Sequence, residues 1–584
     1  MARGASIVPK YTIRLALIWL IPLASWALSG FSLVPSLLAT ALTPVELPKV
    51  RQRLFGAKLK KQIFFLRAPA LLRLAVLWVL QVWWLLLWRA TGPDAGAAAP
   101  DADGIGAEAS TELLGSLSVV LPCASEGEFA LKTVRSVFES TPSALLREII
   151  VVDDGSEPPL EQSHLTAALR SEYRVRLIRH ETTVGLIGAK KAGGDAAAGD
   201  IVVFFDCHVA PQPGWHNSFV RLIADNYRRI VVPVITDLDV GTWQQRRSNG
   251  GNAKCYLTWD ADFKWFQSDD PYVPVLSGGL LGISKRWWNE TGGYDEHMRG
   301  WGGENLDQSL RSWLCGGEIM VARDSFVAHM WRVGSDPRTH AKYHLPPHAA
   351  TANRLRAAVA WFGDFAAKLE QFPAMESKKL GPDGNPWYGS ISNILEVKSR
   401  LQCRSFAWFM RRFKNVYEDG GLLPSETFGL RDPASGQCLT YLGTAGTSGN
   451  GRGKAALRAC EVGNDRQRWH GANRDLSAAG QPCCSGVRAW NTDQCLAAQV
   501  SGGAAETFVC DISGRAVSQH WKLSAGGQLK RTENGFLGGE SCLQPQPGGS
   551  SLEVAACSSP WAKDRPEEPV EWRLYRHAVD TGQA

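Results

Sequence analysis

Residues 200–208 read Asp-Ile-Val-Val-Phe-Phe-Asp-Cys-His, a continuous apolar run that ends in a carboxylate and an imidazole. Residues 148–156, Glu-Ile-Ile-Val-Val-Asp-Asp-Gly-Ser, repeat this construction. Such continuous apolar runs are typical of parallel strands covered by helices on both faces, and ligands bind at the carboxyl ends of such strands. Strand-like runs alternate with helical patterns from Leu117 onward, so we predict an α/β domain with a doubly wound, mostly parallel sheet.

Composition narrows the class of protein. The chain has 584 residues, of which 45% are apolar and 21% charged, which is enough for several folded domains. Its net charge of +6 is small for this length, so we expect no nucleic-acid partner. Thirteen cysteines indicate an oxidising compartment rather than the cytosol.

Apolar segments precede the globular part of the chain. Residues 70–90 are long and apolar enough for a transmembrane anchor, and residues 91–112, rich in Ala, Gly, Pro and Asp, are typical of a short flexible stem. Residues 1–69 combine a basic loop with an earlier apolar stretch, residues 15–42, which is either a second span or an extended N-terminal segment. A cleaved signal peptide is the alternative, but the basic loop lies too far along the chain for one.

Flanking charge predicts the orientation of this anchor. Seven Lys or Arg residues lie between Thr43 and Pro69 beside a single Glu, whereas the stretch from Arg89 to Ala130 has one Arg and seven acids. Positive loops stay in the cytosol, so we expect the part after the anchor to be lumenal.

The carboxylate and imidazole at the end of residues 200–208 point to a metal. Residues two apart on an extended chain face the same side, so Asp206 and His208 converge while Cys207 turns away. One oxygen and one nitrogen ligand suit a divalent cation such as Mn²⁺, although a polar strand end without metal is the alternative. Further along, Gly278-Gly279, Trp301-Gly-Gly-Glu304-Asn305 and His329-Met-Trp-Arg332 add groups suited to a ligand site.

These motifs, in this order and spacing, resemble those of the polypeptide N-acetylgalactosaminyltransferases, over residues 117–375. The resemblance implies a GT-A fold for residues 113–415, a UDP-N-acetylgalactosamine donor, Mn²⁺ as cofactor and transfer of the sugar, with retained configuration, to Ser or Thr of protein acceptors. It also implies residence in the Golgi membrane.

The resemblance implies roles by position. The metal ligands would be Asp206, His208 and His329. The nucleotide and sugar contacts would be Leu121, Asp154, Lys190, Cys207, Gly279 and Trp301, and the catalytic set would be Asp206, Glu304, Asn305 and Arg332. We interpret Glu304 as an acceptor for sugar hydroxyls rather than as a nucleophile.

Departures from the family pattern fall on the nucleotide contacts. Thr183, Ser335 and Pro337 stand where the family has an Arg, a His and a Tyr that reach UDP. A transferase for another UDP-sugar, and a non-catalytic relative that binds glycan or peptide, are therefore the alternatives. The family's disulfide at the end of the catalytic core is matched by Cys315 and Cys403.

The C-terminal part repeats. Residues 425–578 contain Cys-Leu three times, each followed by a second Cys and then by Trp469, Trp521 or Trp572, which predicts a β-trefoil. It resembles the ricin-B-type lectin domain of the same family. That family holds sugar with an Asp after Cys-Leu, and this chain lacks it, so glycan binding is doubtful and a packing module is the preferred interpretation. The replacing residues are Thr440, Ala497 and Gln544. The expected pairs are Cys438–Cys460, Cys495–Cys510 and Cys542–Cys557, which leaves Cys123, Cys207, Cys255, Cys483 and Cys484 unassigned.

Overall fold

The structure is a computed structural model. It describes residues 115–246, 252–340, 345–444, 451–471, 487–498, 505–512, 516–531, 541–546 and 549–584. The expected anchor (70–90), the stem (91–112), and Cys483 and Cys484 lie outside these ranges and stay predictions. Within the described ranges, no helix combines the length and the hydrophobicity needed to span a bilayer.

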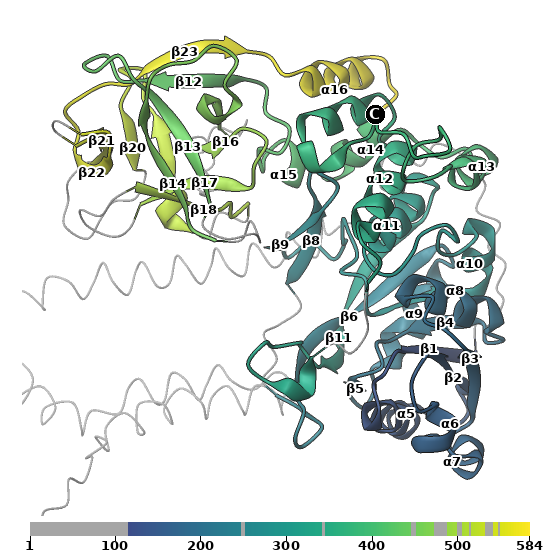
Figure 1. Ribbon diagram of the computed structural model, residues 1–584. Coiled ribbons are helices and arrows are strands. Elements are labelled where there is room, and N and C mark those ends of the chain that lie inside the picture. Colours follow the sequence, from purple (N-terminus) through teal and green to yellow (C-terminus); the bar gives the residue numbers. More distant parts are fainter. Residues whose placement is uncertain are drawn as a thin grey trace, which may run out of the picture. The chain divides into compact units, whose positions relative to one another are not determined.

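A mixed sheet forms the centre of the N-terminal domain, with its strands in the order β3-β2-β1-β4-β10-β6-β11-β5 and β7 beside β6 (Figure 1). Strands β3, β2, β1 and β4 are parallel, as are β6 and β11. The strands are β1 (Leu117–Cys123), β2 (Leu146–Asp154), β3 (Val175–His180), β4 (Ile201–Phe204), β5 (Val209–Pro211), β6 (Arg229–Asp239), β7 (Gln244–Gln245), β10 (Leu281–Ser284) and β11 (Glu318–His329). The hairpin of β8 (Ala253–Leu257) and β9 (Phe263–Gln267) is separate from this sheet.

The expectation of a mostly parallel sheet is only partly correct. Strand β10 runs antiparallel to both β4 and β6, and β5 runs antiparallel to β11. A parallel neighbour needs a long crossover, usually a helix, whereas the described chain between β6 and β10 forms β7 and the β8–β9 hairpin.

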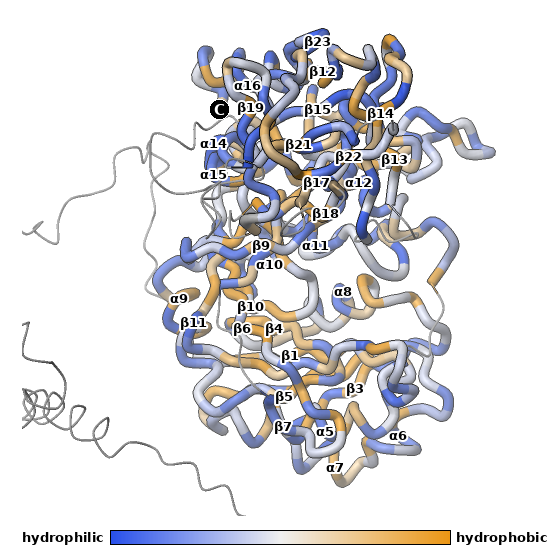
Figure 2. The backbone as a smooth tube through the Cα atoms, turned by 90° about the vertical axis from the view of Figure 1, so that its left-hand side faces the viewer, coloured by the Kyte–Doolittle hydropathy of each residue, from blue (hydrophilic) through white to orange (hydrophobic). Residues whose placement is uncertain are grey.

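Helices cover both faces of the sheet, as the apolar strands require. On β1, Val120 packs in one apolar core with Ile187 of α8, whereas Val119 and Leu121 pack in the other with Val134 of α5. Figure 2 shows the strands β1, β4 and β10 as largely hydrophobic, with α8 and α5 on opposite sides of them. The α-helices of the described residues are α5 (Glu128–Ser140), α6 (Leu160–Ser163), α7 (Ala167–Glu172), α8 (Leu186–Ala196), α9 (His216–Asp225), α10 (Lys285–Thr291), α11 (Glu304–Leu314), α12 (Ala349–Phe362), α13 (Ser392–Arg400), α14 (Phe406–Arg412), α15 (Lys414–Tyr417) and α16 (Val570–Asp580).

The C-terminal domain is all-β up to its final helix α16. The same hydrogen bond occurs three times in this domain. The indole Nε1 atoms of Trp469, Trp521 and Trp561 donate to the backbone carbonyls of residues 439, 496 and 543, respectively, at 2.9–3.0 Å. The prediction that Trp572 is the third equivalent tryptophan is wrong. Trp572 lies in α16, and Trp561 makes the equivalent hydrogen bond. The strands are β12 (Thr427–Arg431), β13 (Cys438–Thr444), β14 (Gly453–Arg458), β15 (Trp469–His470), β16 (Arg488–Ala489), β17 (Gln494–Ala498), β18 (Ala505–Val509), β19 (Trp521–Leu523), β20 (Leu529–Arg531), β21 (Ser541–Pro545), β22 (Leu552–Ala556) and β23 (Ala562–Glu567).

Disulfides staple both domains. The expected pairs are confirmed: Cys315–Cys403, Cys438–Cys460, Cys495–Cys510 and Cys542–Cys557. Cys123 and Cys207, which the sequence analysis left unassigned, form a buried disulfide with their Cα atoms 5.3 Å apart. Strands β1 and β4 are parallel neighbours, so Cys123, the last residue of β1, and Cys207, which follows β4, come together at the carboxyl ends of the two strands. Cys255 is a free, buried thiol.

Candidate active site

The acid and two imidazoles expected to bind metal meet at the sheet edge. Asp206 and His208 lie between β4 and β5, and His329 is the last residue of β11. One ligand atom from each lies within 4.8 Å of the others, and His329 Nε2 is 3.0 Å from Asp206 Oδ2. The imidazole rings of His208 and His329 are 5.1 Å apart. One carboxylate oxygen and two imidazole nitrogens at this spacing can hold a single divalent cation.

The charge state of Asp206 suits a cation ligand. Burial alone would raise its pKa, but the bond from His329 and the positive groups of His208 and Lys190 hold that pKa well below its ordinary value. The carboxylate therefore stays ionised, which is the form that binds a metal ion.

Glu126 contacts both His208 of the metal-ligand cluster and Arg332. Its Oε1 atom accepts from His208 Nδ1 at 3.2 Å and from Arg332 Nη2 at 2.7 Å. Burial would raise the pKa of Glu126, but His208 and Arg332 lower it overall. The sequence prediction missed this role, although Glu126 was visible as an acid following the first strand. Glu126 thus connects the expected metal ligand His208 to Arg332, a member of the expected catalytic set.

Gly279 lets backbone approach the cluster. A Cβ atom placed on Gly279 would be 2.6 Å from Asp206 Oδ2, which is closer than real Cβ contacts come. The adjacent Gly278 has φ +104°, a region that favours glycine, and its carbonyl accepts from Lys190 Nζ at 2.6 Å. The glycine pair therefore serves the wall of this site rather than a simple turn.

Lys190, Glu304 and Asn305, which are expected near the sugar, lie next to the glycine pair. Lys190 is fully buried, with its Nζ atom 3.7 Å from Glu304 Oε1, and Glu304 Oε2 accepts from the Gly302 amide at 3.0 Å. Asn305 donates to the Leu276 carbonyl at 2.9 Å. The structure thus brings Lys190, Glu304 and Asn305 together, with their polar atoms partly used to hold the loop.

Other expected nucleotide residues are placed differently. Both Asp154 carboxylate oxygens accept from backbone amides, Oδ1 from Val184 and Oδ2 from Gly185, and Oδ1 also lies 2.8 Å from His180 Nδ1. The contact of Asp154 with the nucleotide stays a prediction. The Leu121 side chain is fully buried in the core. Cys207 is buried and its sulfur is bonded to Cys123, so its contact with the ligand stays a prediction.

Trp301 is 45% exposed, in contrast to these buried groups. Such an exposed indole can cover a ligand, so its place over the nucleotide stays a prediction. Arg332 also donates from Nη1 to the Thr339 carbonyl at 3.1 Å, which holds the guanidinium close to the cluster.

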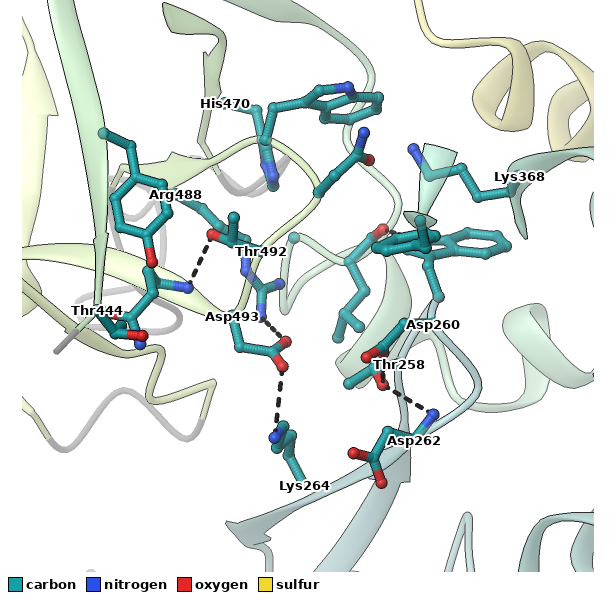
Figure 3. Close-up of a pocket in the computed structure, with 18 of the residues that line it drawn as sticks. Thr258, Asp260, Asp262, Lys264, Lys368, Thr444, His470, Arg488, Thr492 and Asp493 are labelled. Carbon is teal, nitrogen blue, oxygen red and sulfur yellow. Dashed lines mark hydrogen bonds and ion pairs between the residues drawn. The ribbon is translucent and has the colours of Figure 1, made fainter. Parts of the chain in front are cut away.

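A separate polar cavity of about 370 Å³ lies where the β8–β9 hairpin meets the C-terminal domain (Figure 3). Asp493 there lies 3.7 Å from Lys264 and 3.5 Å from Arg488. Asp493 is thus paired with two cations of the cavity wall, and the metal-ligand residues Asp206, His208 and His329 are not among the residues that line this cavity.

Known protein families match the part of the chain that holds the cluster. The model of glycosyl transferase family 2 matches residues 118–291, and that of the N-terminal domain of galactosyltransferase matches residues 266–330. Together these ranges include Asp206, His208 and His329.

Individual relatives are similar over longer ranges. Mouse polypeptide N-acetylgalactosaminyltransferase 3 is 31% identical over 299 residues, 48% of this chain and 46% of the relative. Human polypeptide N-acetylgalactosaminyltransferase 6 is 27% identical over 443 residues, 71% and 66% of the two chains. The crystal structure of GalNAc-T7 with UDP, GalNAc and Mn²⁺ superposes with a TM-score of 0.49 at 21% identity, covering 78% of this chain and 83% of that one. The chain spans about half the length of the first curated relatives that it matches. It is a sequence relative of the polypeptide N-acetylgalactosaminyltransferases.

Proposed function

We propose that this protein is a Mn²⁺-dependent retaining glycosyltransferase that moves N-acetylgalactosamine from UDP-N-acetylgalactosamine to Ser or Thr of proteins. The observation that carries the proposal is the convergence of Asp206, His208 and His329 within 4.8 Å of one another, beside Arg332 and a glycine wall. The names of its sequence relatives support the same substrates.

The residues divide the work by charge. A bound metal ion would supply positive charge where the diphosphate leaves. Arg332, held by Glu126, adds a guanidinium for phosphate oxygens. Buried Lys190 and Glu304 form a polar wall that can orient sugar hydroxyls. With the donor fixed, the acceptor hydroxyl attacks the anomeric carbon as the bond to the diphosphate breaks, and its proton passes to a phosphate oxygen.

A donor panel tests this proposal. The full chain, purified in detergent, is assayed for hydrolysis of several UDP-sugars and for transfer to Ser/Thr peptides, with and without Mn²⁺. We expect UDP-N-acetylgalactosamine to be the preferred donor and Mn²⁺ to be required. If another UDP-sugar is preferred, the assignment of the donor is wrong. If UDP-sugars bind without turnover, the non-catalytic alternative is favoured.

Two finer assignments belong to the same proposal. We assign residues 113–415 to a GT-A fold and residues 425–578 to a β-trefoil, which the three equivalent tryptophan bonds support. The all-β domain serves as a packing module, since its residues after Cys-Leu carry no carboxylate.

The proposed site of action is the Golgi lumen, with residues 70–90 as the anchor. The charge asymmetry around this segment and the disulfides on its C-terminal side support that placement. Protease protection in sealed Golgi vesicles tests it: we expect the part after residue 112 to be protected until the membrane is opened.

A further inference from the structure

Residues 289–291 read Asn-Glu-Thr. In the whole sequence this is the one place where an Asn is followed two residues later by Ser or Thr, with a residue other than Pro between them. The pattern is the acceptor for N-glycosylation in chains that enter the secretory pathway. Neither the metal-ligand cluster nor the expected nucleotide and sugar contacts use these residues, so their place in the fold decides whether the protein can carry a glycan there.

The side chain of Asn289 is exposed near the end of a short helix. It lies in the last turn of α10, which is followed by Gly292 in the left-handed region at φ +78°. The residues that this helix buries are Trp287, Trp288 and Thr291. Asn289 lies on the other face, so a glycan on its amide nitrogen would extend into solvent and displace no packed side chain.

The hydroxyl of Thr291, by contrast, is not accessible. Thr291 is fully buried, and its Oγ1 atom donates to the carbonyl of Trp287 at 2.7 Å. Successive residues of an α-helix are about 100° apart around its axis, so Asn289 and Thr291 face nearly opposite sides. Because the acceptor pattern requires both residues, a transferring enzyme cannot bind them together on the folded helix. The glycan therefore has to be attached before α10 folds.

Helix α10 begins at the end of the sheet away from the metal-ligand cluster. Strand β10 is antiparallel to β4, and its last residue, Ser284, pairs with Ile201, the first residue of β4. Asp206 follows the other end of β4, whereas α10 starts directly after Ser284. A glycan on Asn289 would therefore be attached far from the groups expected to bind the donor, and it would leave the site open.

We infer that Asn289 is an N-glycosylation site that is modified during synthesis, before α10 folds. The inference goes beyond the proposed transferase activity and rests on the proposed lumenal placement. The co-substrate is an oligosaccharide linked to a lipid diphosphate. The Nδ2 atom of Asn289 forms a bond to the anomeric carbon of the first sugar while the bond from that carbon to the diphosphate oxygen breaks. The lipid diphosphate leaves, and the amide proton passes to a base of the transferring enzyme.

Translation of the full chain with endoplasmic-reticulum microsomes tests the inference. Attachment is measured as a decrease in electrophoretic mobility that peptide N-glycosidase reverses, and we expect one glycan per chain. Asn289→Gln should lose it, and so should Thr291→Val, which keeps the shape of the buried side chain without the hydroxyl. Thr291→Ser, which keeps the hydroxyl, should retain it. Asn385→Gln is the matched control, because Asn385 is exposed but lies outside the pattern, and its glycan should be unchanged.

A comparison of folded and unfolded acceptors tests the order of events. Solubilised oligosaccharyl transferase and its lipid-linked donor are added either to the folded, unglycosylated full chain or to a peptide of residues 283–295. We expect the peptide to be modified and the folded chain to remain unmodified, because α10 holds the Thr291 hydroxyl inside the protein. Equal modification of the two would overturn attachment before folding.

Protease protection in the same microsomes separates the inference from the placement on which it rests. An unglycosylated parent chain, or a glycan that persists in Asn289→Gln, overturns the inference. If that unglycosylated chain is protected after residue 112, the lumenal placement stands, and if it is not protected the placement fails as well. The kcat/KM of folded Asn289→Gln for peptide glycosylation should equal that of the parent, since Asn289 lies away from the site.

Discussion

The Oε1 atom of Glu126 lies 3.2 Å from the Nδ1 atom of His208. Glu126 accepts a hydrogen bond from the Nδ1–H group of His208. This bond fixes the orientation of the ring and leaves the Nε2 atom free to bind a metal ion. The same oxygen holds Arg332, so one carboxylate aligns the groups expected on both sides of a diphosphate.

Glu126→Gln should therefore weaken Mn²⁺ binding by about 10–100-fold, because the amide can donate to the ring and no longer selects one tautomer. Mn²⁺ titration by calorimetry, together with the metal dependence of turnover, measures the change. Glu128→Gln is the matched control, since Glu128 is exposed and forms an ion pair with Lys132 on the same helix. Equal Mn²⁺ affinity in the Glu126 variant and the parent would show that the bridge has no positioning role.

Gly279→Ala should remove metal binding without unfolding the protein. The new Cβ would sit 2.6 Å from Asp206 Oδ2, so the carboxylate or the loop has to move. Gly334→Ala is the control, since nothing lies within 4 Å of a Cβ placed there. Mn²⁺ titration and thermal melting are run on both variants. If Gly279→Ala binds Mn²⁺ as the parent does, the close approach is unimportant.

The disulfide between Cys123 and Cys207 should stabilise the fold around the cluster. Its sequence separation of 84 corresponds to a contribution of about 4.6 kcal/mol in the chain-entropy description, against about 3 kcal/mol for the separation of 15 between Cys495 and Cys510. Replacing both members of each pair with Ser and measuring denaturant unfolding tests the order. A smaller loss for the Cys123/Cys207 variant than for the Cys495/Cys510 variant contradicts it.

His470 should make the C-terminal domain sensitive to acid. Burial lowers its pKa to about 3, with help from the charge of Arg488, whereas an unfolded His has a pKa near 6.5. Between those values the unfolded chain binds a proton that the folded chain does not, so the free energy of unfolding decreases as the pH decreases. The slope from this group is roughly 1.4 kcal/mol per pH unit.

Thermal melting from pH 7 to pH 4 measures this slope. His470→Gln should reduce it, whereas His297→Gln, at an exposed His, should leave it unchanged. An identical acid slope in His470→Gln and the parent would exclude this residue as the cause.

The sequence predicted the site better than its surroundings. Asp206 and His208 could be found because period-two geometry on an extended chain places them on one side. His329 joined them only through the family resemblance, since nothing local to β11 indicates that its end reaches the end of β4.

Contacts between distant segments were the ones missed. Glu126 and Arg332 are 206 residues apart, and the Cys123–Cys207 pair required knowing that β1 and β4 are neighbours. The third equivalent tryptophan was misassigned because spacing alone favoured Trp572, whereas the bond to residue 543 selects Trp561. Strand β10 is antiparallel to β6, and β7 and the β8–β9 hairpin, rather than a crossover helix, lie between them. The hydrophobic periodicity of the sequence does not reveal the direction of a strand in its sheet.

Calorimetric titration of Mn²⁺ into the metal-free full chain tests the central claim most directly. We expect one site per chain, which is lost in Asp206→Asn and His329→Ala and retained in Asp336→Asn, whose partly exposed carboxylate pairs with Arg338. Melting temperatures establish that all variants are folded. Unchanged Mn²⁺ affinity in folded Asp206→Asn and His329→Ala proteins would contradict the account.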